Sequence, residues 1–271
     1  MEETKQRSQE EKRKEFEHRI MTGENRWNCS LWIEFEKWER RNNNLERARR
    51  VFARGLARLP SWFKLWYQYI RMELMLGNVD GARQLYQKAA SEHGLLEQGQ
   101  AWPVDHYWLS LGADLWISYA QFEDRNGNEI DRAHRVRAVF EQCIQCYKGA
   151  PRAQAWIWYA NFEEDFGGVS GARNVYERGI ESYEKIIDHD HIAKSKAREE
   201  VKALLVAFAE FEVRCNEIDR AKCVYKRAID CWPLSNFLYF KIVSFKNQYG
   251  NEDIDDLIER KRCYEQGRIE D

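Results

Sequence analysis

Apolar and aromatic side chains recur at steps of three and four residues along most of the chain. The stretch 65–89 shows this most clearly, because Trp66 and Tyr69 share one helical face. The pattern is interrupted at Gly77 and Asn78 and then restarts. Asn78 is a suitable N-cap for the helix that follows it. The stretch therefore predicts two helices joined by a tight turn, that is, a helical hairpin.

Variants of this hairpin recur through the sequence, and the first helix usually carries a tryptophan at the same point: Trp32, Trp66, Trp116 and Trp156. In four copies an aromatic residue follows this position 20 residues later, whereas in the third copy the offset is 24. We expect four inserted residues near Ala133 and His134. The predicted repeats span about 31–60, 63–93, 114–147, 152–187, 203–232 and 235–266.

The repeats define the predicted domain organisation, because hairpins that contact only their neighbours form one elongated all-α array. We expect the array to cover residues 15–265 and to begin with a short capping helix from Glu15 to Ile20. Residues 1–14 are polar and are predicted to be disordered. Insertions are expected at 94–112 and 188–202, and an acidic tail at 266–271.

A charge pattern runs through the repeats: a glutamate on the first helix is followed ten residues later by an arginine or lysine on the second. The pairs are Glu39 with Arg49, Glu73 with Arg83, Glu163 with Arg173, Glu212 with Lys222 and, shifted by the insertion, Glu123 with Arg137. Charges at one register of an apolar frame indicate a partly buried pair that fixes how the two helices dock. The alternative is that both are surface charges.

Composition excludes several classes of protein. The 271 residues carry a net charge of −2, which excludes a uniformly basic nucleic-acid binder but leaves local basic faces possible. No apolar run approaches the roughly 20 residues of a membrane span. The N-terminus lacks the apolar stretch of a signal peptide, and the seven cysteines fit no secreted framework. We therefore expect a protein of the cytosol or nucleus.

Two short motifs resemble metal sites. Cys143 and Cys146 form a C-x-x-C motif, but no second ligand pair completes it, so we interpret both as packing residues of a second helix. The alternating Asp188-His189-Asp190-His191 places only two ligands on one helical face and is interpreted as a solvated loop. No phosphate-binding loop and no nucleophile with its base are present. We predict no metal, no cofactor, no small-molecule substrate and no enzyme activity.

Two surfaces are candidates for binding. The insertion 94–112 carries Trp102, Tyr107 and Trp108, which either dock on the array or form a partner-binding surface.

The second candidate is a basic stripe opposite the apolar face of repeat one, made of Arg47, Arg50, Arg54 and Arg58, with Arg40 and Arg41 at the neighbouring helix end. Residues 31–60 hold eight Lys or Arg against four Asp or Glu. Spaced guanidinium groups can follow RNA phosphates. The alternative is a solvated face bridged to acidic neighbours.

The repeat pattern, Leu-Trp-x-x-Tyr-x-x-Phe-Glu followed by Ala-Arg-x-x-Tyr/Phe-x-Arg-Ala/Gly, resembles the half-a-TPR (HAT) repeat. Residues 72–83, MELMLGNVDGAR, resemble one repeat of the crooked neck splicing factors, and residues 12–17, 206–212 and 261–264 resemble other parts of the same family. The resemblance covers about residues 11–265. Members of that family are usually much longer.

The resemblance implies a right-handed α-solenoid, or superhelix, that acts in the nucleus as a non-catalytic scaffold of the spliceosome. The implied partners are subunits of the nineteen complex, including a Myb-type subunit and another HAT-repeat subunit, together with small nuclear RNA or pre-mRNA. The repeat tryptophans and the Glu–Arg pairs would then build the array, and function would lie on outward positions. Within the wider HAT family, pre-mRNA 3′-end processing and ribosomal RNA maturation remain alternative functions.

Overall fold

The computed structural model describes residues 2–22, 28–59, 62–96, 106–146, 152–189, 194–233 and 235–249. Over these ranges all regular secondary structure is α-helical. The chain forms two compact units, Met1–Asn126 and Gly127–Asp271. The all-helical repeat fold predicted from the sequence is therefore confirmed in each unit. The right-handed superhelix concerns how the units are placed relative to each other, and it stays a prediction.

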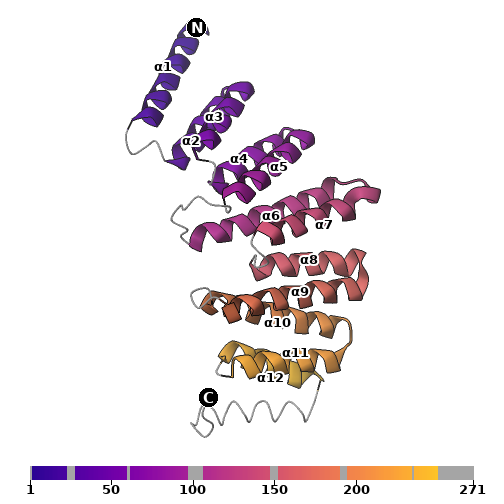
Figure 1. Ribbon diagram of the computed structural model, residues 1–271. Coiled ribbons are helices and arrows are strands. Elements are labelled where there is room, and N and C mark those ends of the chain that lie inside the picture. The colour runs from indigo at the N-terminus through magenta and orange to yellow at the C-terminus, as the bar shows by residue number, and fades with distance from the viewer. Residues whose placement is uncertain are drawn as a thin grey trace. The chain divides into compact units, whose positions relative to one another are not determined.

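The first unit begins with one long helix, which is followed by two hairpins and by the first helix of repeat three (Figure 1). Its helices are α1 (Glu2–Met21), α2 (Cys29–Arg41), α3 (Leu45–Arg58), α4 (Phe63–Met75), α5 (Val79–Leu96) and α6 (His106–Asn126). Within this unit α2 packs on α3 and α4 packs on α5. The first helices also contact each other, since α4 touches both α2 and α6.

The second unit continues with the second helix of repeat three, two hairpins and the first helix of repeat six (Figure 1). Its helices are α7 (Glu129–Cys146), α8 (Ala153–Phe166), α9 (Gly168–His189), α10 (Lys194–Arg214), α11 (Ile218–Cys231) and α12 (Asn236–Tyr249). Here α8 packs on α9, and α10 packs on both α9 and α11. The predicted second helix of repeat six lies outside the described residues.

The turns inside the hairpins use the left-handed backbone conformation. Asn43, Gly77 and Asn216 stand four residues after the repeat glutamate and have φ values of 60°, 72° and 61°. Glycine and asparagine adopt this conformation more readily than other residues, and it commonly ends a helix. The next residue starts the second helix: Asn78 accepts a hydrogen bond from the amide of Gly81 at 3.0 Å, so its predicted role as an N-cap is confirmed.

Large apolar side chains of the first helices fill the core of each hairpin, and the four repeat tryptophans are buried. The second helix has a small residue where it passes these tryptophans. At Gly55 a Cβ atom would lie 2.9 Å from Leu65 of the next repeat and 3.1 Å from Trp32. At Gly179 the corresponding distances are 2.8 Å to Leu204 and 2.9 Å to Trp156. Helices approach closely at this register because it carries no bulk.

Neighbouring repeats are joined by stacked aromatic rings. The aromatic residue of one second helix stacks on the aromatic residue of the next first helix, with ring centroids 4.9 to 5.0 Å apart and ring planes within 15° of parallel. The pairs are Phe16 with Phe35, Phe52 with Tyr69, Tyr86 with Tyr119, Phe140 with Tyr159, and Tyr176 with Phe208. Such ring pairs stabilise packing beyond the burial of their area.

The structure differs from the prediction at the N-terminus. Residues 1–14 were predicted to be disordered, yet α1 is continuous from Glu2 to Met21. Its register explains the difference: Arg13 and Phe16 have the spacing of Arg49 and Phe52 in repeat one. Phe16 and Ile20 are buried, and Arg13 forms an ion pair with Glu39 of α2. α1 thus packs as the second helix of a repeat and is longer than a short cap.

The extra four residues of repeat three lie inside a continuous helix. α7 runs through Ala133 and His134 without interruption. Four residues are close to one helical turn, so the insertion lengthens the helix while keeping Arg137 and Phe140 on their usual faces. The two longer insertions are partly helical as well, because α6 begins at His106 and α10 at Lys194. Residues 97–105 and 190–193 lie outside the described part.

Candidate interaction surfaces

The repeat glutamates and arginines form ion pairs, but the partners differ from those predicted. Glu39 pairs with Arg13, and Arg49 pairs with Glu73 of the following repeat. The prediction that each glutamate pairs with the arginine of its own hairpin is wrong. The reason is the direction in which the side chains point: the arginine stands three residues before the stacked aromatic, so it faces the next first helix as that ring does.

These pairs link neighbouring repeats in the same geometry, with the arginine Nε donating to Oε1 of the glutamate at 2.6 to 2.9 Å. They are Arg13 with Glu39, Arg49 with Glu73, Arg83 with Glu123, Arg137 with Glu163, and Arg173 with Glu212. We call this set the ion-pair ladder. In four of the five pairs the guanidinium also donates through Nη2 to the second carboxylate oxygen, at 2.7 to 3.2 Å.

Burial makes these contacts matter for stability. Glu73 is 2% exposed, and an unpaired carboxylate at this depth would be strongly destabilised. Burial by itself would raise the pKa of Glu73, but hydrogen bonds from Arg49 and Asn78 outweigh it and hold the pKa below the ordinary value. The same contact raises the pKa of Arg49. The pair is therefore charged at neutral pH.

The ladder stops at the last junction of the described chain. Lys222 stands where the other repeats have arginine, and Lys246 stands where they have glutamate. Lys222 instead forms an ion pair with Asp219 of its own helix at 3.1 Å. The predicted pair of Glu212 with Lys222 is wrong for the same reason as the others, because Arg173 holds Glu212.

Half of the predicted basic stripe is engaged in contacts within the protein. Arg54 makes two hydrogen bonds of 2.6 Å with Glu17 of α1. Arg58 donates to the sulfur of Met21 and lies over the ring of Trp32. Arg40 is paired with Glu36 at 2.8 Å. Arg54 and Arg40 are thus bridged to acidic neighbours, whereas Arg58 contacts a sulfur atom and an aromatic ring.

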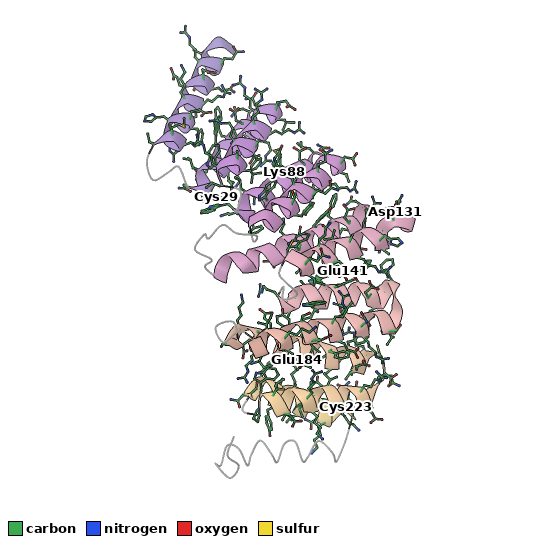
Figure 2. The ribbon with its side chains drawn as sticks, viewed as in Figure 1. Cys29, Lys88, Asp131, Glu141, Glu184 and Cys223 are labelled. Carbon is green, nitrogen blue, oxygen red and sulfur yellow. The ribbon has the colours of Figure 1, made fainter. Side chains whose placement is uncertain are left out.

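Arg54 belongs to a second contact between neighbouring second helices. Glu17 follows the stacked aromatic of α1, and Arg54 comes two residues after that of α3. The same two positions pair Arg178 of α9 with Glu141 of α7, at 2.8 Å, and Glu141 is labelled in Figure 2. In both pairs the hydrogen bonds between the two side chains raise the pKa of the arginine and lower the pKa of the glutamate. Such a recurring pair indicates a structural role.

Arg41, Arg47 and Arg50 are the members of the stripe that remain available. All three are exposed, and within the described residues none forms a hydrogen bond or an ion pair. Arg47 and Arg50 are three residues apart on α3, and Arg41 ends α2. A phosphate group could approach these guanidinium groups without displacing a protein partner. The structure thus reduces the candidate nucleic-acid surface from six arginines to three.

The aromatic insertion cannot be placed in the same detail. Trp102 lies outside the described residues, and for Tyr107 and Trp108 the structure describes the helix α6 but not the side chains. Both interpretations of this insertion, docking on the array and contact with a partner, stay predictions.

The structure places both cysteines of the C-x-x-C motif on α7, where Cys143 is buried and Cys146 is half-buried.

Within the described ranges, no three His, Cys, Asp or Glu side chains are grouped so as to hold a metal ion. Asp188 and His189 end α9, so the predicted loop is helical at these two residues, and the side chains of all four residues of Asp188-His189-Asp190-His191 are not described. Among the helices that the structure describes, none has the length and apolar character needed to cross a membrane.

Comparison with known families gives two matches. Residues 12–181 match the family described as "Pre-mRNA-splicing factor Syf1/CNRKL1 N-terminal HAT repeat". Residues 110–266 match the family described as "Suppressor of forked protein (Suf)". The first match begins within α1, close to Arg13 and Phe16, which agrees with the packing of α1 as part of a repeat.

Individual relatives carry related names. Crooked neck-like protein 1 of Dictyostelium discoideum is 30% identical over 120 residues, which cover 44% of this chain and 16% of that protein. Pre-mRNA-splicing factor cwf3 of Schizosaccharomyces pombe is 23% identical over 314 residues, which cover 86% of this chain and 38% of that protein. Pre-mRNA-splicing factor CLF1 of Paracoccidioides brasiliensis is 30% identical over 224 residues, which cover 72% of this chain and 30% of that protein. The chain spans well under half the length of each relative. It belongs to the crooked neck and Syf1 family of HAT-repeat proteins.

Proposed function

We propose that this protein is a nuclear pre-mRNA-splicing factor that acts as a non-catalytic scaffold, holding subunits of the spliceosome, in particular of the nineteen complex, in place. Family membership and the names of its relatives support the role in splicing. Under this proposal the partners include a Myb-type subunit, another HAT-repeat subunit and RNA of the spliceosome.

The ion-pair ladder is the observation that carries the scaffold role. A scaffold needs surfaces that keep their spacing while partners bind to them. Each junction of the ladder combines a stacked ring pair with a buried charge pair, as at Phe52–Tyr69 and Arg49–Glu73. Both contacts are directional, so they fix the rotation and the register of one hairpin on the next. The ladder contacts raise the pKa values of Arg13, Arg49, Arg137 and Arg173, which supports a structural use of these charges.

Purification of the tagged full-length chain from nuclear extract tests the proposal. We expect spliceosomal proteins and small nuclear RNAs to co-purify, and an extract depleted of the protein to lose splicing until the wild-type chain is added back. A variant with Arg49→Met and Arg173→Met, which breaks one ladder pair in each unit, should restore splicing less well than the wild type. Arg220→Met with Lys226→Met, at exposed positions of α11, is the matched control.

Other outcomes would contradict the proposal. Recovery of 3′-end processing factors or of pre-ribosomal proteins, with no spliceosomal subunit, would replace splicing by one of the two alternative functions of the HAT family. Full activity of the ladder variant, if its unfolding temperature has fallen as expected, would separate splicing from the rigidity of the repeats.

Direct RNA contact is a second candidate function, favoured by the unpaired state of Arg41, Arg47 and Arg50. A filter-binding assay with single-stranded RNA tests it. Arg47→Glu with Arg50→Glu should remove most retention at low salt and lower the slope of log affinity against log salt by about 1.4, since each phosphate contact contributes about 0.7. Arg220→Glu with Lys226→Glu changes the net charge equally and should bind as the wild type does. Equal retention by both variants would show that α3 does not contact RNA.

A further inference from the structure

The first helices of the first unit share a stripe of exposed and half-buried positions. It is made of the positions two residues before the tryptophan and two, five and nine residues after it, which lie on one helical face. On α2 the stripe ends with Lys37 and Arg41, and both are exposed. On α4 the positions five and nine residues after Trp66 are Arg71 and Met75, again exposed.

The stripes of α2, α4 and α6 lie next to each other, because α4 contacts both of the other helices. Their last two positions hold four cations and no acid: Lys37 and Arg41, Arg71 with Met75, and Gln121 with Arg125. The first two positions include the exposed acids Glu34 and Asp114, so the stripe is basic only at this end. Packed helices lie about 8–10 Å apart, so these cations repel one another across neighbouring helices. None of the four forms a hydrogen bond or an ion pair within the described residues. We call this set the basic row.

Helix dipoles account for only part of the basic row. Arg41 and Arg125 lie in the last turn of their helices, where a cation is stabilised by the helix dipole. Lys37 and Arg71 lie further from the helix end, where this effect has faded. Among the described residues, the first unit thus carries two cations, Lys37 and Arg71, for which neither an ion pair nor a helix dipole accounts.

The same positions in the second unit carry no such row. α8 has Asn161 and Asp165 there, and α10 has Glu210 and Arg214. Arg214 is paired with Glu164 at 2.8 Å, and Glu210 is paired with Lys241 of α12. The basic row is therefore a property of the first unit and does not follow from the repeat pattern itself.

Exposed apolar side chains of α4 lie on the stripe, at Met75, and beside it, at Tyr67. Lys64, Tyr67, Arg71 and Met75 follow each other along α4 at steps of three and four residues. Tyr67 is 50% exposed and Met75 is 57% exposed, and the neighbouring Leu74 and Leu76 are exposed as well. Protein interfaces are enriched in Tyr and Met, whereas RNA is bound through stacking rings and phosphate contacts to which aliphatic side chains add little. The mixture favours a protein partner over a nucleic acid.

We propose that the exposed face of α2, α4 and α6 binds an acidic peptide segment that carries at least one aliphatic or aromatic residue. The carboxylates of the segment lie against Lys37, Arg41, Arg71 and Arg125, and its apolar side chain lies on Tyr67 and Met75. Charge complementarity selects the acidic segment and fixes its register, while the apolar contact supplies much of the affinity. The site lies on other helices than Arg47 and Arg50, shares only Arg41 with the candidate RNA surface, and does not depend on the role in splicing.

A selection from a random-peptide display library on the immobilised full-length chain tests the proposal, because it does not presuppose the partner. We expect the selected peptides to be enriched in Asp and Glu together with Leu, Phe or Trp. Binding of a synthetic selected peptide should weaken about tenfold or more when Lys37, Arg41, Arg71 and Arg125 are all changed to Glu. Tyr67→Ser with Met75→Ser should weaken it several-fold.

A matched variant carries the same change of charge on second-type helices of the same unit: Lys14→Glu, Arg47→Glu, Arg50→Glu and Lys88→Glu, all at exposed positions. It should bind the selected peptide as the wild type does, and circular dichroism should show equal helicity for all variants. Three results would overturn the proposal: no enrichment of acidic peptides, equal weakening by the two charge-reversed variants, or oligouridine binding that depends on the basic row more strongly than peptide binding does.

Discussion

The junction between repeats one and two and the last described junction are built differently. At the first, Arg49 pairs with Glu73 and Phe52 stacks on Tyr69. At the last, between α11 and α12, two lysines replace the charge pair, and Ile242 stands where the other first helices have the stacked ring. Tyr225 instead meets Phe245, with centroids 5.3 Å apart and planes tilted by 54°.

What remains at the last junction is an apolar cluster, formed by Ala209, Ala221, Tyr225, Ile229, Ile242 and Phe245. Apolar contact is therefore sufficient to bring these two helices together. The ion pair and the stacked rings of the other junctions add direction, since a hydrophobic contact alone tolerates rotation and sliding. The difference indicates that burial builds the repeat array and that the ladder sets its register.

Breaking a ladder pair should have the largest effect. We expect Arg49→Met to destabilise the protein by about 3 kcal/mol, because Glu73 is left buried without its cation. A double-mutant cycle measured by chemical denaturation should show strong coupling of Arg49 to Glu73→Gln. Its coupling to Glu39→Gln should be near zero, as Glu39 binds Arg13. Stronger coupling of Arg49 to Glu39 would show that Arg49 pairs with the glutamate of its own hairpin.

Gly179→Ala should have the next largest effect. In a helix this change usually stabilises by about 1 kcal/mol. Here the new Cβ atom would lie 2.8 Å from Leu204, so we expect a net loss of about 1–2 kcal/mol from overpacking. Thermal unfolding gives the sign directly. The reverse-sense control is Ala89→Gly, at the same register, which should lose stability through helix propensity and through the loss of one buried methyl group. A more stable Gly179→Ala variant would contradict close helix contact here.

Acid should weaken the Arg49–Glu73 pair of the ladder, although less than removal of a partner does, because a protonated carboxyl still accepts hydrogen bonds. The pKa of Glu73 lies below its ordinary value of 4.5, so its contribution is present above that value and is lost as pH falls through the lower folded-state pKa. The pKa values of Glu17 and Glu141 are also lowered, so their contributions to stability are likewise lost as pH falls. Burial raises the pKa of Glu36, which gives an effect of opposite sign.

Thermal unfolding between about pH 7 and about pH 3 measures this dependence. The unfolding temperature of the wild type should fall at acidic pH, and the curve of Glu73→Gln should be flatter. Identical curves for the two proteins would show that another group controls the acid sensitivity.

Building a ladder pair into the last junction should have the smallest effect. We expect Lys222→Arg with Lys246→Glu to stabilise by about 0.5–1 kcal/mol, because both positions are partly accessible to water. Lys222→Arg alone should change little. A loss of stability in the double variant would mean that the charge pair forms only beside a stacked ring pair, and Ile242→Tyr could then be added to test this.

The repeat frame could be predicted from the sequence because its periodicity is local. The positions of Trp66, Asn78 and their equivalents follow from helix spacing and capping. The partner of Arg49 could not be found in this way, since it depends on how one hairpin rotates against the next. One signal was available: the spacing of Arg13 to Phe16 equals that of Arg49 to Phe52, and it identifies α1 as a second helix.

The basic stripe shows a similar limit. Sequence places six arginines on repeat one but does not show that Glu17, 37 residues before Arg54, reaches the same guanidinium group. The basic row was missed because its members are spread over three helices, each with one or two cations. Only the packing of α4 between α2 and α6 brings them to one face.

Cys143 occupies the register that Gly55 and Gly179 fill in other repeats, and it is fully buried. A thiol reagent can reach its sulfur only when α7 separates from its neighbours. Cys223 and Cys231 are exposed and would react at once, which provides an internal reference. Cys29 of α2 is also buried, so the slow phase of thiol labelling in a Cys29→Ala chain would report how often this part of the array opens under native conditions.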